Sequence, residues 1–175
     1  MMKSNIVICG FMASGKTTVG KLISEITGME FVDTDELVER AAGSSVEAIF
    51  NSGGEEEFRL LEREVVQEIA TRSGLVIALG GGAVTDEMNV KDVRATGVVY
   101  LLKVSASEAL ERSVEGPARP LLGKDIGDTE GLLAEREKAY KSAADVVVDT
   151  SGRAPGEIAR EIAEDFSGAR SRGDA

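Results

Sequence analysis

The stretch GFMASGKT, residues 10–17, matches the pattern G-x-x-x-x-G-K-T and directly follows the apolar run Ile6–Cys9. Glycines at both ends let the backbone curl so that successive N–H groups point at phosphate oxygens. In such a cradle Lys16 reaches the terminal phosphates and the Thr17 hydroxyl ligates Mg²⁺. Apolar side chains then recur at helical spacing, and a helix N-terminus favours anions. The alternative, a glycine turn that binds nothing, is disfavoured because a strand precedes the motif and a helix follows it.

Length and composition indicate one domain over residues 1–166. The chain has 175 residues, of which 42% are hydrophobic, enough for a sizeable core. Its net charge of −11 argues against nucleic-acid or membrane-surface binding, because both favour a basic face. An anionic substrate must then be gathered by a local group of arginines. The small and charged residues 167–175 are expected to form a disordered tail.

The absence of histidine and the single cysteine limit the chemistry. Ser-His-Asp and Cys-His schemes and histidine-containing metal sites are excluded, so any general base is Asp, Glu, Lys or water. Cys9 lies in the first apolar run, where we expect a buried side chain. It cannot form an intramolecular disulfide, which fits a reducing cytoplasm. No apolar run approaches the roughly 20 residues of a membrane span.

Apolar runs rich in β-branched residues alternate with segments of helical periodicity. This βαβ alternation predicts an α/β fold with a parallel sheet between two helical layers, and ligands beyond the carboxyl ends of the strands. The five predicted strands are Ile6–Cys9, Glu30–Val32, Leu75–Leu79, Val98–Leu102 and Val146–Val148.

Residues 113–128 form a predicted loop, because they hold two of the three prolines and no sustained periodicity. A loop of this length is usually a lid or a linker, and the helical pattern that resumes near Glu130 favours a mobile lid. Arg119 within it can bring positive charge onto a transferring phosphoryl group. A solvated loop arginine is the open alternative.

Asp33 and Asp35, at the end of the second strand, place two carboxylates near the phosphate cradle. One can hold the Mg²⁺ shell, and the other can orient or deprotonate a substrate hydroxyl. A helix cap, with Asp33 at the N-cap and Glu36 three residues later, is the structural alternative, and the two roles are compatible.

Other arginines and a run of glycines also have two interpretations. Arg59 has glutamates at i−4, i−3 and i+3, and periodicity alone favours pairing within its own helix. Three glycines after the third strand are a plain turn or let a ligand approach the backbone. Arg112 and Arg136 flank the loop, and each alone indicates a surface charge. Arg153, after the last strand, is a loop charge or stacks on a nucleotide base.

Together these residues closely resemble the shikimate kinase family, from about Ile6 to Ile162. The phosphate loop alone indicates a P-loop nucleotide-binding protein; the further motifs, in the family's order and approximate spacing, make the resemblance specific. They are Phe31-Val32-Asp33-Thr34-Asp35, Phe58-Arg59, Gly80-Gly81-Gly82-Ala83-Val84, Arg119-Pro120-Leu121-Leu122 and Val148-Asp149-Thr150.

The resemblance implies a three-layer α/β/α P-loop kinase that transfers the ATP γ-phosphoryl group to the 3-hydroxyl of shikimate in aromatic amino-acid biosynthesis. Mg²⁺ would be held by Thr17 and, through water, by Asp33.

The implied catalytic residues are Asp35, Lys16 and Arg119. The implied ATP-binding residues are Ala13, Ser14, Gly15, Lys16, Thr17, Thr18, Arg112, Arg119 and Arg153. The implied shikimate-binding residues are Asp35, Arg59, Gly80, Gly81, Gly82 and Arg136, the two arginines on the carboxylate. We expect a monomer with shikimate and ATP as partners.

Two positions depart from the family pattern. Ala13 stands where the family often has glycine, and we expect an ordinary backbone conformation there. Lys138 stands where the family often has proline, two residues after the carboxylate-binding arginine, so the helix is less sharply punctuated.

Two other functions compete with this one. A related small-molecule kinase such as gluconate kinase also takes a hydroxy acid, so an arginine pair alone does not exclude it. A catalytically silent nucleotide-binding module that regulates a partner is the second. The presence of Lys16, Asp35 and Arg119 argues against a silent module.

Overall fold

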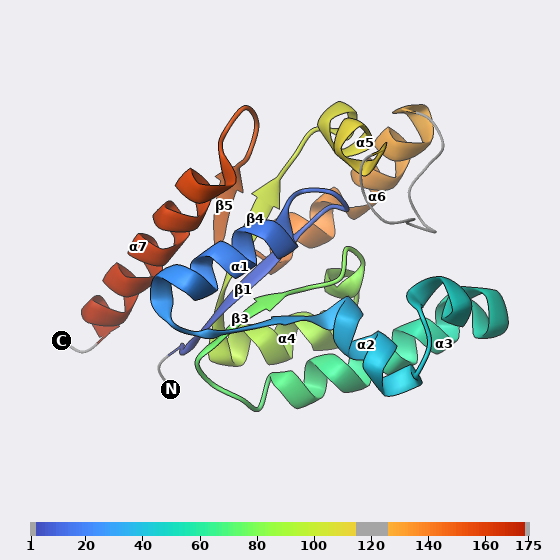
Figure 1. Ribbon diagram of the computed structural model, residues 1–175, viewed down its shortest axis with the longest axis horizontal. Coiled ribbons are helices and arrows are strands. Elements are labelled where there is room, and N and C mark those ends of the chain that lie inside the picture. Colours follow the sequence, from blue (N-terminus) through green and yellow to red (C-terminus); the bar gives the residue numbers. More distant parts are fainter. Residues whose placement is uncertain (1–2, 115–125, 174–175) are drawn as a thin grey trace.

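A single parallel sheet forms the centre of the computed structural model, which describes residues 3–114 and 126–173. Its strands run in the order β2-β3-β1-β4-β5 (Figure 1). They are β1 (Asn5–Gly10), β2 (Glu30–Asp33), β3 (Leu75–Ala78), β4 (Gly97–Lys103) and β5 (Val146–Asp149). The sheet confirms the five predicted strands, whose bounds shift by no more than one residue at either end.

The central strand β1 is buried along its whole length. It pairs in parallel with β3 on one side and β4 on the other. A strand covered on both faces is a continuous apolar run, which explains why the segment Ile6–Cys9 does not alternate with polar residues. Because all pairs are parallel, the segments that follow β1, β2 and β3 emerge at the same edge of the sheet.

One face of the sheet carries α1 (Lys16–Thr27) and α7 (Pro155–Gly173), which lie side by side (Figure 1). Their apolar stripes bury one side of the strands. The buried residues of this layer are Ile6, Ile8, Val19, Ile23, Val76, Tyr100, Leu102, Val148, Ile158, Ala159, Ile162 and Phe166.

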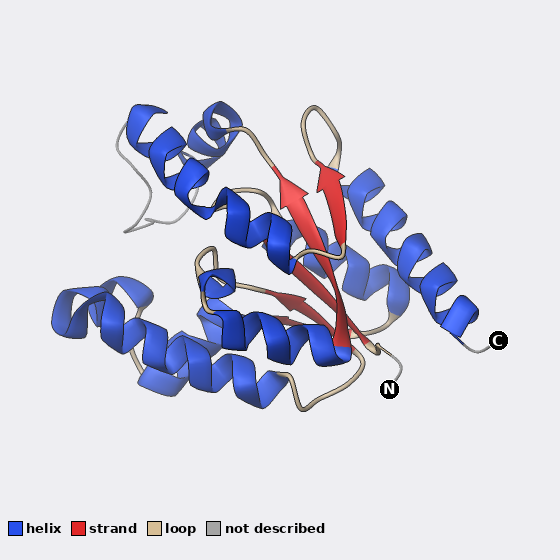
Figure 2. Ribbon diagram, turned by 180° about the vertical axis from the view of Figure 1, so that it is seen from behind, coloured by secondary structure: helices blue, strands red, loops and turns tan. Residues whose placement is uncertain are grey.

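The opposite face carries α3 (Val46–Ile69), α4 (Glu87–Thr96) and α6 (Ile126–Ala143), with α5 (Ala106–Val114) packed on α6. Figure 2 shows from behind that helices cover both faces of the sheet. A short 3₁₀ turn, η1 (Ala83–Thr85), joins the end of β3 to this layer. The predicted three-layer α/β/α arrangement is therefore confirmed.

The helix α3 also packs against α2 (Thr34–Ala42), which directly follows β2. Their small core contains Val38, Ile49, Phe58 and Val65. The helix α3 is kinked at Gly54, whose φ of 74° and ψ of −171° are open to glycine but not to residues with a Cβ. The kink lets Phe50, before it, face Phe58, after it, with ring centroids 4.9 Å apart.

The structure differs from two predicted boundaries. The loop predicted over 113–128 is wrong at its edges, because 113–114 end α5 and 126–128 begin α6, whose first turn contains the acidic Asp128. Residues 115–125 of the predicted lid, with Arg119, lie outside the described residues. The tail predicted over 167–175 is wrong for 167–173, which continue α7. Ser167 there donates a hydrogen bond to the Ala163 carbonyl. In the described ranges no helix is both long and apolar enough to cross a bilayer.

Candidate active site

The phosphate loop connects the carboxyl end of β1 to the N-terminus of α1. Gly15 caps α1 in a left-handed conformation, with φ of 94°, which a residue with a Cβ rarely adopts. The Ser14 N–H donates to the Phe11 carbonyl across the loop, at 3.2 Å. The Lys16 ammonium donates to the carbonyl oxygens of Gly10 (2.9 Å) and Phe11 (3.0 Å). A helix N-terminus and a lysine thus meet at one point, which suits an anion.

Ala13 contradicts the expectation of an ordinary backbone conformation. Its φ is 59°, and it is the one non-glycine residue with a positive φ in the described part of the chain. The reason is the loop itself, which turns from strand to helix at this position whatever side chain it carries. A residue with a Cβ adopts the left-handed region at a cost of about 1–2 kcal/mol.

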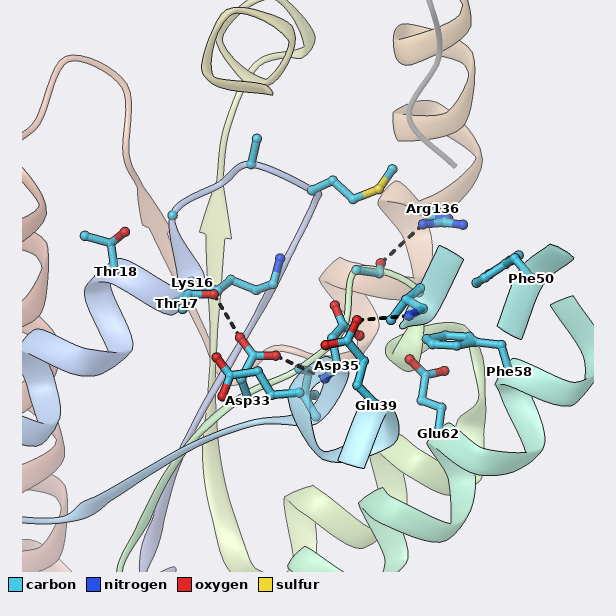
Figure 3. A pocket seen from close by; sticks show the side chains of 18 of the residues that line it. Lys16, Thr17, Thr18, Asp33, Asp35, Glu39, Phe50, Phe58, Glu62 and Arg136 are labelled. Atoms are coloured by element: carbon cyan, nitrogen blue, oxygen red, sulfur yellow. Dashed lines mark hydrogen bonds between the residues drawn. The ribbon is translucent and has the colours of Figure 1, made fainter. Parts of the chain in front are cut away.

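Thr17 and Asp33 join the phosphate loop to the carboxylate pair that follows β2. The Thr17 Oγ1 donates to Asp33 Oδ2 at 2.8 Å, and Asp33 Oδ1 accepts from the Asp35 N–H at 3.0 Å (Figure 3). Asp33 is the N-cap of α2, so the predicted cap is confirmed. The same side chain nevertheless turns one oxygen to the phosphate loop, so the capping role leaves it available to a metal shell.

The oxygens of Thr17 and Asp33 suit Mg²⁺, a hard cation that takes one or two protein oxygens, substrate phosphates and several waters. Among the described residues, no group of three or more Asp, Glu or Cys side chains is arranged to hold a metal by itself.

Arg59, on α3, lies between two glutamates of its own helix. Its Nη2 is 2.9 Å from Glu55 Oε1, and its Nη1 is 2.8 Å from Glu62 Oε2. The predicted pairing within the helix is therefore confirmed. Its guanidinium also lies 5.4 Å from the centre of the Phe58 ring, where cation–π attraction adds to the pairing. These partners hold the side chain in one place.

Glu62 is the buried partner of this arginine, with 1% of its side chain exposed. Burial raises the pKa of Glu62, the Arg59 charge offsets part of that rise, and the nearby Asp35 carboxylate adds to it. Burial disfavours the charge on Arg59, but the charges and hydrogen bonds of Glu62 and Glu55 outweigh burial and raise its pKa. The pair is electrostatically coupled and lies close to the predicted general base.

The three glycines after β3, the glycine segment, pass beneath these side chains, and a Cβ on the first or the third of them would meet charged groups. A Cβ on Gly80 would lie 2.5 Å from Asp35 Oδ1 and 2.8 Å from Glu62 Oε1. A Cβ on Gly82 would collide with the Arg59 guanidinium. A side chain at either position would therefore displace the charged groups that approach the segment.

Arg136 reaches the glycine segment from α6, on the other side. It is 7% exposed, and its Nη1 donates to the Gly81 carbonyl at 3.4 Å. The surface charge that its position alone indicated is thus wrong, because α6 packs this face against η1 and β4. The helix continues through Lys138 to Ala143, so the missing proline does not displace the arginine from a helical face.

A cavity of about 560 Å³ connects the phosphate loop with the two arginines. In Figure 3, Asp35 lies between Lys16 and Thr17 on one side and Glu62 and Arg136 on the other. The predicted site residues that line it are Ala13, Gly15, Lys16, Thr17, Thr18, Asp33, Asp35, Arg59, Gly81, Gly82, Arg112 and Arg136.

Other predicted residues lie beside this cavity or elsewhere. Ser14 and Gly80 are buried behind its wall. Arg153 is bonded to the Asp149 carbonyl at 3.1 Å and to the Glu161 carboxylate, and it does not line the cavity. Arg119 lies outside the described residues.

Comparison with known proteins identifies the family. The family model described as shikimate kinase matches residues 12–167. A shikimate kinase of Moorella thermoacetica is 46% identical over 164 residues, which cover 93% of this chain and 94% of the relative. The chain belongs to the shikimate kinase family. A solved shikimate kinase of Acinetobacter baumannii, in complex with shikimate, superposes with a TM-score of 0.90 at 33% identity, covering 95% of this chain and 94% of the other.

The likeness to gluconate kinases is weaker in both sequence and structure. A gluconokinase of Sinorhizobium meliloti covers 97% of this chain and 94% of its own with a TM-score of 0.56 and 16% identity. At that identity the likeness shows a shared fold alone. Sequence and structure thus place the chain with the shikimate kinases.

For this member of the shikimate kinase family, several residues at the cavity were not among those predicted. The sequence indicates Glu62 only as a helix partner of Arg59, because its burial depends on how α3 packs. Phe50 depends on the kink at Gly54. The hydroxyls of Thr34 and Tyr140 bond to backbone groups of the glycine segment. The sequence signal for them is their position, Thr34 between two aspartates and Tyr140 one helical turn after Arg136.

Two buried side-chain oxygens have no hydrogen-bond partner among the described residues, and both belong to this site. They are Ser14 Oγ in the phosphate loop and Glu62 Oε1 near the glycine segment. Buried polar atoms without partners are unfavourable, and water or a ligand usually satisfies them.

Proposed function

We propose that the chain transfers the γ-phosphoryl group of ATP to the 3-hydroxyl of shikimate, giving ADP and shikimate 3-phosphate. One observation carries the proposal: a single cavity has a phosphate loop at one end and two buried or half-buried arginines, from different helices, at the other. Shikimate carries one carboxylate and three ring hydroxyls, which match an arginine pair and a carboxylate with backbone donors.

ATP is placed by the phosphate loop. Backbone N–H groups of residues 13–18 at the start of α1 would bind its phosphates, and Lys16 would leave the carbonyls of Gly10 and Phe11 to neutralise charge on the transferring group. Arg112, which lines the cavity from α5, and Arg153 are assigned to the adenine side. Arg119 is assigned to the γ-phosphate by the family resemblance.

Mg²⁺ would be held by the Thr17 hydroxyl and, through water, by Asp33. When bound, the ion would supply positive charge that offsets the charge on the phosphates during transfer. The hydrogen bond between Thr17 and Asp33, 2.8 Å long, keeps their two oxygens together beside the phosphate loop.

Shikimate would lie at the other end, with its carboxylate between Arg59 and Arg136. Forked guanidinium groups suit a planar carboxylate, and two of them from separate helices fix its direction. The Gly81 N–H, which donates to no acceptor among the described residues, and the Asp35 carboxylate would hold the ring hydroxyls.

Asp35 would orient the 3-hydroxyl toward the γ-phosphate and accept its proton as the new P–O bond forms. Its N–H is fixed by Asp33, so its carboxylate is set relative to the phosphate loop. Because phosphoryl transfer needs little covalent assistance, position and charge supply most of the catalysis.

The proposal includes a monomer in the cytoplasm. Cys9 supports a reducing compartment, because it is a buried free thiol whose pKa burial raises to about 12. Such a thiol is unreactive and has no disulfide partner.

A coupled assay of ADP release tests the function. With ATP, Mg²⁺ and shikimate we expect saturable ADP formation, and with gluconate in place of shikimate only the background ATPase rate. Equal turnover of gluconate would favour the gluconate kinase alternative. Nucleotide binding without turnover of either acid would favour a silent regulatory module.

A further inference from the structure

The glycine segment has no side chains with which to fix itself, so its neighbours must set the position of its backbone. Its 3₁₀-like turn is closed locally, since Ala83 N–H donates to Gly80 O and Thr85 N–H to Gly82 O. Two groups from distant elements hold the remaining points. Gly80 N–H donates to Thr34 Oγ1 at 2.8 Å, and Gly81 O accepts from the Tyr140 hydroxyl at 2.5 Å.

Tyr140 approaches from α6, one helical turn after Arg136. It is 3% exposed and belongs to the core on that face of the sheet. Its hydroxyl and the Arg136 guanidinium donate to the same carbonyl oxygen, that of Gly81. The position of the glycine segment is thereby tied to the position of the arginine.

The Tyr140 hydroxyl remains a donor across the working pH range. Burial raises its pKa to about 12, with the Arg136 charge opposing the rise. A protonated phenol beside a carbonyl oxygen donates one hydrogen bond to it, so this contact does not change with pH near neutrality.

Thr34 approaches from the opposite side, at the start of α2. It is fully buried, although its two neighbours, Asp33 and Asp35, line the cavity. Its hydroxyl accepts from the glycine segment while the same turn presents Asp35 to the cavity. Thr34 therefore ties the segment to the carboxylate that would handle the substrate hydroxyl.

We propose that Tyr140 and Thr34 are positioning residues that clamp the glycine segment from both sides and set its backbone against Arg136 and Asp35. This rests on the proposed function, in which the Gly81 N–H binds a ring hydroxyl of shikimate. Neither residue lines the cavity; each acts through the backbone of the glycine segment. The two hydrogen bonds thus fix the position of Arg136, which would bind the carboxylate, relative to Asp35 and the Gly81 N–H, which would bind the hydroxyls.

The test compares two tyrosines that lose the same atom. Tyr140→Phe removes the hydroxyl at the glycine segment. Tyr100→Phe is the matched control, because Tyr100 is equally buried and its hydroxyl donates to Asp165 Oδ2 at 2.9 Å, on the other face of the sheet. A purely structural role would lower the thermal midpoint in both variants and leave substrate constants alone.

We expect Tyr140→Phe to raise the KM and the calorimetric Kd for shikimate about fivefold or more, an effect of the size that one lost hydrogen bond gives. The KM for ATP should stay within about twofold, and Tyr100→Phe should change neither constant by more than that. Thr34→Val should act like Tyr140→Phe, whereas Thr34→Ser, which keeps the acceptor, should restore most of the affinity.

The possible results distinguish a failure of the positioning role of Tyr140 and Thr34 from a failure of the proposed function. If the parent phosphorylates shikimate while both tyrosine variants keep its shikimate constants, or change ATP and shikimate constants equally, the clamp is wrong and the function stands. If Tyr140→Phe is too unstable to assay, the comparison of Thr34→Val with Thr34→Ser decides in the same way. If the parent neither binds nor phosphorylates shikimate, the proposed function is wrong and the clamp with it.

Discussion

The two ends of the cavity are built in opposite ways. The phosphate end consists of the phosphate loop, residues 10–17, with Asp33 beside it, so most of it comes from consecutive residues. The substrate end consists of Arg59, Glu62, Arg136 and the glycine segment, which come from α3, α6 and the turn after β3. One end is determined by local sequence, and the other forms only when distant elements pack together.

This difference has a consequence for mutation. A change at the phosphate end alters a group on a self-contained loop, and the rest of the site keeps its shape. A change at the substrate end also alters the packing that places its neighbours, since Arg59 and Glu62 are paired and the glycine segment passes beneath them. We therefore expect local losses at one end and coupled losses at the other.

Asp35, between the two ends, should give the largest effect. We expect Asp35→Asn to lower kcat by about 100-fold or more, because it removes the proton acceptor while keeping the side chain's shape. Binding of ADP, measured by calorimetry, should be unchanged because the phosphate loop is intact. Turnover within about threefold of the parent, a barrier change well under 1 kcal/mol, would remove Asp35 from a catalytic role.

The arginines test the coupled end. Arg59→Ala and Arg136→Ala should each raise the shikimate KM about 10- to 100-fold through loss of charge-assisted hydrogen bonds, with little change in the ATP KM. Arg63→Ala is the control, since Arg63 lies on the same helix but pairs with Asn89 and Asp92. A selective rise in the ATP KM would reassign that arginine to the nucleotide side.

The variants Arg59→Ala and Arg136→Ala should also differ in their free energy of unfolding. Arg59→Ala leaves the buried Glu62 without its cation, so this variant should unfold more easily than Arg136→Ala. Because the Glu62 pKa is raised in the folded protein, its stabilising contribution is present at low pH and is lost as pH rises through that pKa. Urea unfolding should therefore show a larger deficit for Arg59→Ala at pH 8 than at pH 5. A deficit independent of pH would contradict the coupling.

Asp145, far from the site, is a carboxylate whose pKa is lowered, whereas the pKa of Glu62 is raised. Burial opposes its ionisation, but hydrogen bonds from Lys3 and the Val99 N–H and the charges of Lys3 and Arg94 lower its pKa. Asp145→Asn should cost about 1–2 kcal/mol of unfolding free energy at pH 7. Since a lowered pKa stabilises above the unfolded value, the difference should shrink as pH falls below about 4. Substrate constants should not move; a shift in KM would show that this end of the sheet influences the site.

Ala13→Gly should give the smallest effect and confine it to the phosphate end. Relief of the left-handed conformation should raise the unfolding free energy by roughly 0.5–1 kcal/mol, part of the gain being lost to the flexibility of glycine in the unfolded chain. The shikimate KM should stay as in the parent. Thermal unfolding of the two proteins side by side measures the gain, and a lower midpoint for the glycine variant would contradict it.

The sequence predicts the phosphate end better than the substrate end for a physical reason. The strand, the glycines and Lys16 are neighbours in the chain, so their pattern contains the geometry. The burial of Arg136 does not follow from its own helix, because it depends on what α6 packs against. Likewise, the three glycines are compatible with a plain turn or with a ligand close to the backbone, and their pattern does not show that Arg59 and Asp35 approach them. Ala13 shows the converse, a local expectation overruled by the turn that the loop must make.

The central claim is that one end of the cavity delivers a phosphoryl group and the other selects shikimate. The most direct measurement is a competition in which the protein, Mg²⁺ and ATP are mixed with equimolar shikimate and gluconate, and the products are followed by ³¹P NMR. We predict that the phosphate monoester signal belongs to shikimate 3-phosphate and grows in step with ADP. A signal from phosphogluconate, or ADP formed with inorganic phosphate alone, would contradict the account.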